Sequence, residues 1–117
     1  MKPTHLVVQP YQSAYPDPII LNKGETLTTS DRQTDWPGWI WCTTASGDSR
    51  WVPDVFLDLL EGLAVLRRDY NPVELSVHPG EQLTAQELVN GWAWCTNQVG
   101  QQGWVPLDSL QAIQDEG

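Results

Sequence analysis

The sequence predicts an all-β protein made of two small five-stranded barrels that pack against each other. Short apolar or alternating runs are separated by clusters of Gly, Pro, Asn, Asp and Ser, which is typical of strands joined by turns. No long segment combines helical periodicity with helix caps. One part of the chain also repeats at a constant offset, which indicates that the same unit occurs twice.

The repeat is clearest in a tryptophan-rich segment. Residues 38–57 align with residues 91–110 at an offset of 53, and ten of these twenty aligned positions are identical. Both copies read Gly-Trp-x-Trp-Cys-Thr and, further on, Trp-Val-Pro. A second match, Gly-Glu-x-Leu-Thr at 24–28 and 80–84, has an offset of 56, so the first copy is three residues longer within 30–36. We therefore expect a first barrel at 1–60 and a second barrel at 61–117.

The strand-like runs follow in the same order in both copies. They cover 6–8, 25–29, 39–43 and 50–52 in the first copy, and 64–67, 81–85, 92–96 and 103–105 in the second. A single helical turn after a proline is expected at 54–56 and at 107–109. So many short strands in so little chain favour a small barrel, because barrel closure hides the strand edges. The junction 57–66 is short and apolar, unlike a flexible linker, so we expect docked copies, with one strand able to run from the first copy into the second.

The charge balance excludes some classes of partner. The chain has 6 Lys and Arg against 15 Asp and Glu, a formal net charge of −9. Nucleic acid and anionic membranes are therefore not expected as partners, because Lys and Arg supply the affinity for phosphate backbones. No apolar run is long enough to span a bilayer, and the N-terminal segment lacks the features of a signal peptide, so we expect a cytoplasmic location.

The cysteines and histidines give no sign of catalysis. Cys42 and Cys95 occupy equivalent positions of the two copies, where they are expected to be reduced core thiols, since equivalent sites in two barrels seldom meet. His5 and His78 stand alone, with neither metal-ligand spacing nor a nucleophile and its base nearby in the sequence. We expect no catalytic residues, no metal, no cofactor and no enzyme activity.

Tryptophan is unusually frequent, with seven residues in the chain. Six of the seven fall in three repeat-paired positions: 39 and 92, 41 and 94, and 51 and 104. Strand alternation places Trp39 and Trp41 on one face and Ile40 and Cys42 on the other. The aliphatic and thiol side chains suit a barrel interior, so we expect outward indoles, and the second copy repeats the pattern. Such indoles either face a ligand or cover the neighbouring copy or a second chain.

Both copies resemble the Src homology 3 (SH3) domain in the order of their motifs. The second copy does so through Arg68-Asp69-Tyr70, Glu74-Leu75-Ser76-Val77, Pro79-Gly80-Glu81, Gly91-Trp92 and Gly103-Trp104-Val105-Pro106. The first copy does so through Tyr11, Ile19, Gly24-Glu25, Gly38-Trp39, Trp51-Val52-Pro53 and Phe56-Leu57. A tandem of this kind is similar to the short bacterial variants of the family.

The resemblance implies a groove for extended, proline-containing peptides, in which an indole stacks on proline rings. The implied peptide-binding residues are Tyr11, Trp39, Pro53 and Phe56 in the first copy, and Tyr70, Glu74, Trp92 and Pro106 in the second. Both copies depart from the family at other groove positions, where the first has Gln9 and Pro18 and the second has Arg68 and Ser109.

Acidic residues surround the predicted grooves. They are Asp17, Asp31 and Asp35 in the first copy, and Asp69, Glu74 and Glu87 in the second. These carboxylates either select a basic peptide or keep a tryptophan-rich surface soluble. The sequence thus predicts a non-enzymatic module that binds a protein or peptide ligand. The alternative is a structural assembly protein whose indoles are buried between the copies or in a homodimer, and the choice between monomer and homodimer stays open.

Overall fold

The computed structural model describes residues 2–13, 19–31 and 37–113, and the predicted all-β class is confirmed. The elements within these ranges are β1 (His5–Val7), β2 (Thr26–Ser30), β3 (Trp39–Thr43), β4 (Ser49–Pro53), the 3-10 turn η1 (Asp54–Phe56), β5 (Leu57–Leu60), β6 (Leu63–Leu66), β7 (Gln82–Val89), β8 (Trp92–Thr96), β9 (Gln102–Pro106), the 3-10 turn η2 (Leu107–Ser109) and β10 (Leu110–Ala112). Both 3-10 turns follow a proline, as predicted. No helix in these ranges has the length and apolar character needed to cross a membrane.

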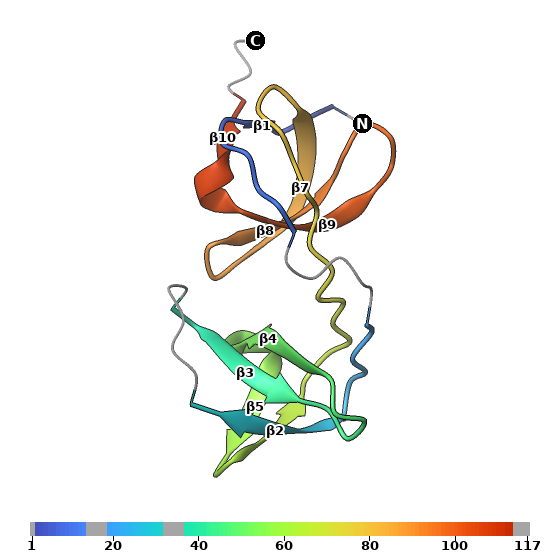
Figure 1. Ribbon diagram of the computed structural model, residues 1–117, viewed down its shortest axis with the longest axis vertical. Coiled ribbons are helices and arrows are strands. Elements are labelled where there is room, and N and C mark those ends of the chain that lie inside the picture. Colours follow the sequence, from blue (N-terminus) through green and yellow to red (C-terminus); the bar gives the residue numbers. More distant parts are fainter. Residues whose placement is uncertain (1, 14–18, 32–36, 114–117) are drawn as a thin grey trace. The chain divides into compact units, whose positions relative to one another are not determined.

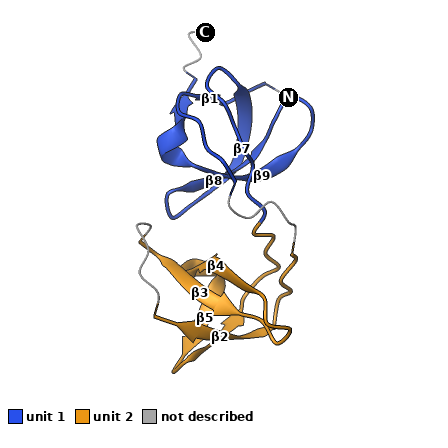
Figure 2. Cartoon of the chain, in the orientation of Figure 1, with its two compact units in different colours: residues 1–17, 73–117 blue, residues 18–72 orange. Residues whose placement is uncertain are grey.

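The strands form two five-stranded antiparallel sheets, in agreement with two small SH3-like barrels (Figure 1). Their strand orders are β10-β1-β7-β8-β9 and β4-β3-β2-β6-β5. The chain separates into two compact units (Figure 2). Unit 1 comprises residues 1–17 and 73–117, and unit 2 is the continuous stretch 18–72. These units differ from the division at 60/61 that the repeat predicts.

The tight hairpin between β5 and β6 explains the difference. Glu61 and Gly62 alone join the two strands, and Gly62 has a positive φ of 73°, which suits a tight turn. Two residues cannot carry the chain to another sheet, so β6 pairs with β5 on one side and with β2 on the other. The matching place in unit 1, between β10 and β7, is filled by β1.

The two first-strand segments are therefore exchanged between the repeats. In unit 1, the Val7 N–H donates to the Glu81 carbonyl at 2.8 Å. In unit 2, the Leu66 N–H donates to the Glu25 carbonyl at 3.0 Å. Further along, Tyr11 forms an isolated antiparallel bridge with Val77, and Tyr70 forms the same bridge with Leu21. The acceptors in the two units are equivalent positions of the repeat, Glu25 with Glu81 and Leu21 with Val77. The first-strand position is therefore hydrogen-bonded in the same way in both units.

Each unit has an apolar core beneath its sheet. In unit 1 the core cluster consists of Val7, Leu75, Val77, Leu83, Ala93, Cys95 and Val105. In unit 2 the buried residues include Leu21, Leu27, Cys42, Val52, Leu57, Ala64 and Leu66. The predicted inward orientation of Cys42, Ala93 and Cys95 is confirmed, since each is at most 2% exposed. Ile40, which was predicted on the same face as Cys42, is only half-buried.

Candidate functional site

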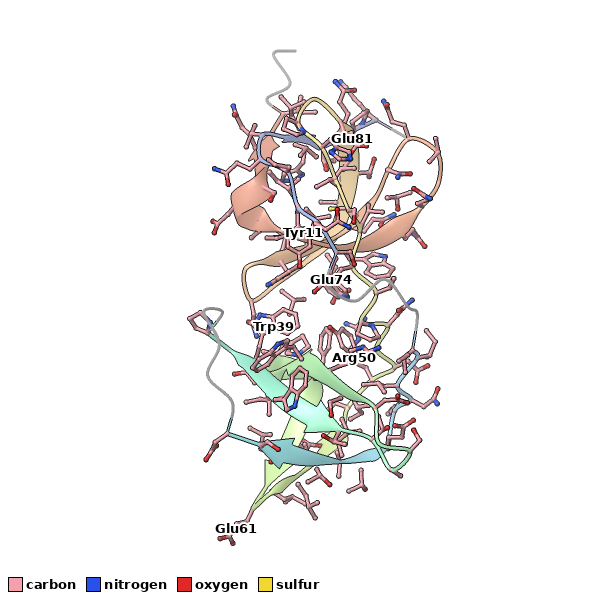
Figure 3. The ribbon with its side chains drawn as sticks, viewed as in Figure 1. Tyr11, Trp39, Arg50, Glu61, Glu74 and Glu81 are labelled. Atoms are coloured by element: carbon pink, nitrogen blue, oxygen red, sulfur yellow. The ribbon has the colours of Figure 1, made fainter. Side chains whose placement is uncertain are left out.

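Unit 1 assembles an aromatic and acidic cluster from three distant parts of the chain. Tyr11 follows β1, Trp92 opens β8, and Glu74 lies in the segment that leads to β7. The rings of Tyr11 and Trp92 meet edge to face, with centroids 5.5 Å apart and an interplanar angle of 85°. The Tyr11 hydroxyl donates a hydrogen bond of 2.7 Å to the Glu74 carboxylate, and the two side chains point toward each other (Figure 3). We call Tyr11, Glu74 and Trp92 the unit 1 cluster.

Glu74 is held in place because its segment runs beside β9. The Trp104 N–H donates to the Val73 carbonyl at 3.0 Å, and the Leu75 N–H donates to the Trp104 carbonyl at 3.1 Å. Gly103 permits this approach, since a Cβ at that position would lie 2.7 Å from the backbone nitrogen of Leu75. The equivalent position of the first repeat carries an arginine, Arg50. The second repeat thus has, at Gly103, the small residue that this close approach requires.

Unit 2 builds a different cluster at the corresponding place. The rings of Phe56 and Tyr70 lie 5.5 Å apart at 61°, again edge to face. The Arg68 guanidinium carbon lies 4.3 Å from the centroid of the Phe56 ring, which is a cation–π contact. The Tyr70 hydroxyl donates to the Trp51 carbonyl at 3.4 Å. Unit 2 therefore carries a positive charge on its aromatic cluster, where unit 1 carries a carboxylate.

The strand exchange regroups the predicted peptide-binding residues. The sequence grouped Tyr11 with Trp39, Pro53 and Phe56, but the structure places Tyr11 in unit 1 beside Trp92. The resulting sets are Tyr11, Glu74, Trp92 and Pro106 in unit 1, and Trp39, Pro53, Phe56 and Tyr70 in unit 2. The signal for this regrouping was the two-residue turn Glu61-Gly62, which fixes β6 beside β5.

The expected exposure of the first indole in each copy is wrong. Trp39 is 8% exposed and Trp92 is 6% exposed. Each lies directly opposite a buried proline on the next strand, Pro53 or Pro106, and the Tyr11 ring also contacts Trp92. Alternation along a strand predicts the face of a side chain but not what covers that face.

The other repeated tryptophans pack against one another across the strands. Trp41 lies opposite Trp51, with ring centroids 5.0 Å apart, and Trp94 lies opposite Trp104, with centroids 5.4 Å apart. Both pairs are edge to face, a geometry that stabilises aromatic contacts beyond their buried area. The repeated Trp-x-Trp and Trp-Val-Pro motifs are thus the two sides of a cross-strand pair.

The remaining acidic candidates have separate positions. Asp69 accepts a hydrogen bond of 2.7 Å from the Lys23 N–H and so belongs to a turn of unit 2. Glu87 lies opposite Trp94 in the register of β7 and β8, and Asp31 is exposed. Asp17 and Asp35 lie outside the described residues, as does the predicted departure Pro18.

The cysteines are free and buried, one in each unit. Burial raises the pKa of the Cys42 thiol to about 11 and that of the Cys95 thiol to about 12. Both thiols are therefore protonated and poorly nucleophilic at neutral pH. Within the described part of the chain, no three His, Cys, Asp or Glu side chains gather where they would hold a metal ion.

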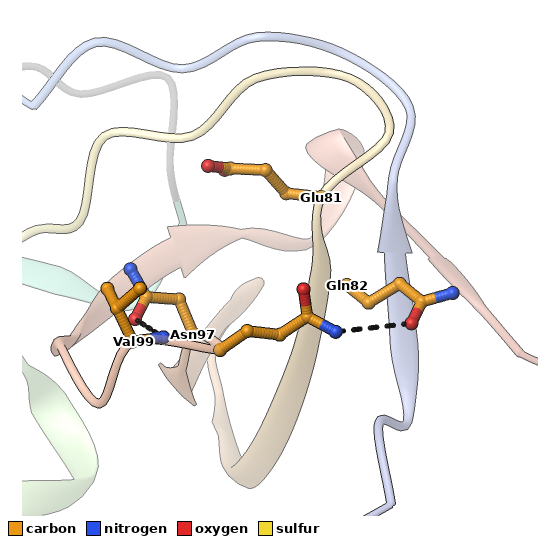
Figure 4. Close-up of a pocket in the computed structure, with 5 residues that line it drawn as sticks. Glu81, Gln82, Asn97 and Val99 are labelled. Carbon is orange, nitrogen blue, oxygen red and sulfur yellow. Dashed lines mark hydrogen bonds between the residues drawn. The ribbon is translucent and has the colours of Figure 1, made fainter.

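A small hollow lies elsewhere in unit 1, with a volume of about 140 Å³ (Figure 4). It is lined by Glu81, Gln82, Asn97, Gln98 and Val99. Its amides bond to their neighbours: the Gln98 amide donates to Gln82 at 3.5 Å, and the Val99 N–H donates to the Asn97 side chain at 3.1 Å. No residue of the unit 1 cluster lines this hollow.

Comparison with known proteins identifies one domain. The family described as the variant SH3 domain matches residues 65–113. The match begins within β6 and covers the second repeat as a continuous stretch, whereas unit 1 has β1 in that first-strand place. No curated protein and no solved structure matches the chain. The SH3 domain is a protein-interaction module and not typically an enzyme, so the match supports a protein-binding role.

Proposed function

We propose that unit 1 binds an extended, proline-containing, basic peptide segment of another protein at the unit 1 cluster. The observation that carries the proposal is the contact between Tyr11, Trp92 and Glu74. The half-buried Tyr11 ring, backed by the buried Trp92 indole, offers an aromatic surface to proline rings. Polyproline II peptides lose little entropy on binding. A carboxylate beside those rings favours a peptide with arginine or lysine next to its prolines.

The two units should not select the same peptides. Unit 1 presents the Glu74 carboxylate, whereas the aromatic cluster of unit 2 already carries the Arg68 guanidinium over the Phe56 ring. The Glu74 carboxylate favours a basic side chain at the first cluster, whereas the Phe56 ring of the second is already covered by Arg68. We therefore place the basic specificity in unit 1.

A peptide array tests the proposal. Each proline-containing sequence is offered with arginine and with citrulline, its uncharged counterpart, and binding is followed by tryptophan fluorescence and calorimetry. We expect the arginine forms to bind more tightly, and Glu74→Gln to remove about threefold to tenfold of that preference, the usual scale for a partly exposed charge pair. The control is Tyr70→Phe in unit 2, which should leave the affinity unchanged.

Two results would count against the proposal. One is an array in which no peptide binds. The other is a Glu74→Gln variant that retains the full preference for arginine. Light scattering on the same samples gives the mass in solution, and a dimer that binds no peptide would favour the assembly alternative.

A further inference from the structure

We propose that unit 2 regulates the unit 1 cluster through the strand exchange, because the folded state of unit 2 holds the N-terminal segment, and with it Tyr11, against unit 1. The regulatory part rests on the proposed function, whereas the coupling between the two units does not. The coupling follows from how the chain is connected and from the hydrogen bonds at the two points where it passes between the units.

Unit 2 is a continuous stretch whose two ends meet. It consists of residues 18–72, and its last strand, β6, is fixed locally by the two-residue turn after β5. Near its ends, the Leu21 N–H donates to the Tyr70 carbonyl at 2.8 Å, and the Tyr70 N–H donates to the Leu21 carbonyl at 2.8 Å. Once unit 2 has folded, residues 21 and 70 are therefore paired, and Tyr70 reaches its own cluster without any help from unit 1.

Unit 1 is split into two pieces that only unit 2 connects. Its first piece contributes β1, a strand of three residues between β10 and β7, followed by Tyr11. The Tyr11 N–H donates to the Val77 carbonyl at 3.0 Å, and the Val77 N–H donates to the Tyr11 carbonyl at 2.9 Å. Val7 is only 1% exposed, so this piece completes the core of unit 1 as well as its cluster.

The length of the connecting loop sets the size of the coupling. With unit 2 folded, the Leu21–Tyr70 pair shortens the loop between Tyr11 and Val77 to about 17 residues. With unit 2 unfolded, the loop is about 65 residues of flexible chain. Loop closure becomes less favourable with the 3/2 power of length, so the docking equilibrium of the N-terminal piece falls roughly eightfold. Linkage is reciprocal, so docking of the N-terminal piece stabilises unit 2 by the same factor, and a ligand on the unit 1 cluster stabilises unit 2 by at most that factor.

Matched core variants of the full chain test the coupling. Leu27→Ala in unit 2 and Leu83→Ala in unit 1 are equivalent positions of the repeat, and both side chains are fully buried. Amide hydrogen exchange is followed residue by residue in increasing urea. Once the unit 2 amides of Leu27→Ala have lost protection, we expect the Tyr11 and Val77 amides to exchange roughly eightfold faster than in the wild type. Unchanged protection of these amides would overturn the proposal.

Cysteine pairs test the exchange itself and cover the case in which Leu27→Ala unfolds the whole chain. His5 lies opposite Ala112, so H5C with A112C should oxidise to an intramolecular disulfide and restore protection of the Tyr11 amide in Leu27→Ala. The control pairs H5C with L59C, the position equivalent to Ala112 in the first repeat, and it should not crosslink. A disulfide in the control pair, or none in the first pair, would show that each repeat closes on its own strand.

Peptide affinity separates this proposal from the proposed function. Under conditions where unit 2 is open, an arginine peptide that binds the wild type should bind Leu27→Ala more weakly, by at most about eightfold and in proportion to the fall in the docked fraction of the N-terminal piece, and the H5C/A112C disulfide should restore the affinity. Equal affinity in a variant whose docked fraction, measured by exchange of the Tyr11 amide, has fallen would overturn the regulation. If no peptide binds any variant, the proposed function fails, while the hydrogen-exchange result still decides the coupling.

Discussion

The two units share one fold and differ in how the chain builds it. Unit 2 comes from a single stretch, and unit 1 from two stretches on either side of it. Both have the same strand order and the same hydrogen bonds at the first strand, yet unit 1 places Glu74 beside its tyrosine and unit 2 places Arg68 over its phenylalanine. The repeated positions thus determine the fold, while the unrepeated positions give each cluster its charge.

The largest expected difference between the units is at Gly103. In Gly103→Val, the new Cβ would lie 2.7 Å from the backbone nitrogen of Leu75, so the segment around Glu74 must leave β9 and lose its hydrogen bonds there. We expect a loss of about 3 kcal/mol of stability in unit 1, with a smaller loss in unit 2 that does not exceed the coupling between the units. The control is Arg50→Val at the equivalent position of unit 2, which loses the Arg50 hydrogen bond to the Ser49 carbonyl at 2.7 Å but brings no Cβ against a neighbouring backbone, and should cost about 1 kcal/mol. Urea unfolding with unit-specific hydrogen exchange measures both, and equal effects would contradict the assignment.

A smaller difference is expected between the two tyrosine hydroxyls. Tyr11→Phe removes a 2.7 Å bond to a carboxylate, and Tyr70→Phe removes a 3.4 Å bond to a backbone carbonyl. Hydrogen bonds to charged groups are the stronger ones, so we expect losses of about 1.5 and about 0.5 kcal/mol. Chemical denaturation of the two variants compares them directly. A larger loss for Tyr70→Phe would mean that the Tyr11–Glu74 bond is weak in solution.

The smallest difference concerns alkaline pH. The ordinary thiol pKa is 9.0, and burial raises it to about 11 for Cys42 and about 12 for Cys95. The unfolded chain therefore loses these protons first as the pH rises, so stability is full below about pH 9 and falls above it, until about pH 11 for unit 2 and about pH 12 for unit 1. At pH 10 we expect each unit to lose about 1 kcal/mol relative to pH 8.

Alanine variants isolate this thiol effect from other groups that titrate in the same range. Cys42→Ala should flatten the pH dependence of unit 2 alone, and Cys95→Ala that of unit 1 alone. Unfolding curves at pH 8, 10 and 11 provide the measurement. An unchanged slope in both variants would show that the thiols do not control alkaline stability.

Much of the fold could be predicted because it depends on local patterns. Alternation placed Cys42, Ala93 and Cys95 inside, and the proline before each 3-10 turn marked both turns. The repeat predicted two barrels because matching runs of apolar residues must be buried in matching ways.

The site was harder to predict because the two first-strand segments carry the same pattern. Val7 and Leu66 are both buried, and Tyr11 and Tyr70 both follow four residues later, so either segment suits either slot. The two-residue connection between β5 and β6 decides between them, because it is too short to carry β6 to the other sheet. Glu74 was identified from its resemblance to a groove position, whereas its partner Tyr11 was assigned to the other copy.

The pairing of β1 with β10 has a consequence for the connectivity of the molecule. The Ile113 N–H donates to the Thr4 carbonyl at 2.9 Å, in the positions that Leu60 and Leu63 hold at the β5–β6 turn. A designed variant in which Glu-Gly joins Ile113 directly to Thr4 would be a cyclic chain. Its new β10–β1 hairpin would be equivalent to the β5–β6 hairpin. Cutting that cyclic chain at Glu61 and Gly62 would make unit 1 the continuous barrel and unit 2 the divided one. The direction of the coupling would then reverse, because folded unit 1 would shorten the loop that closes unit 2, with no change in any core side chain.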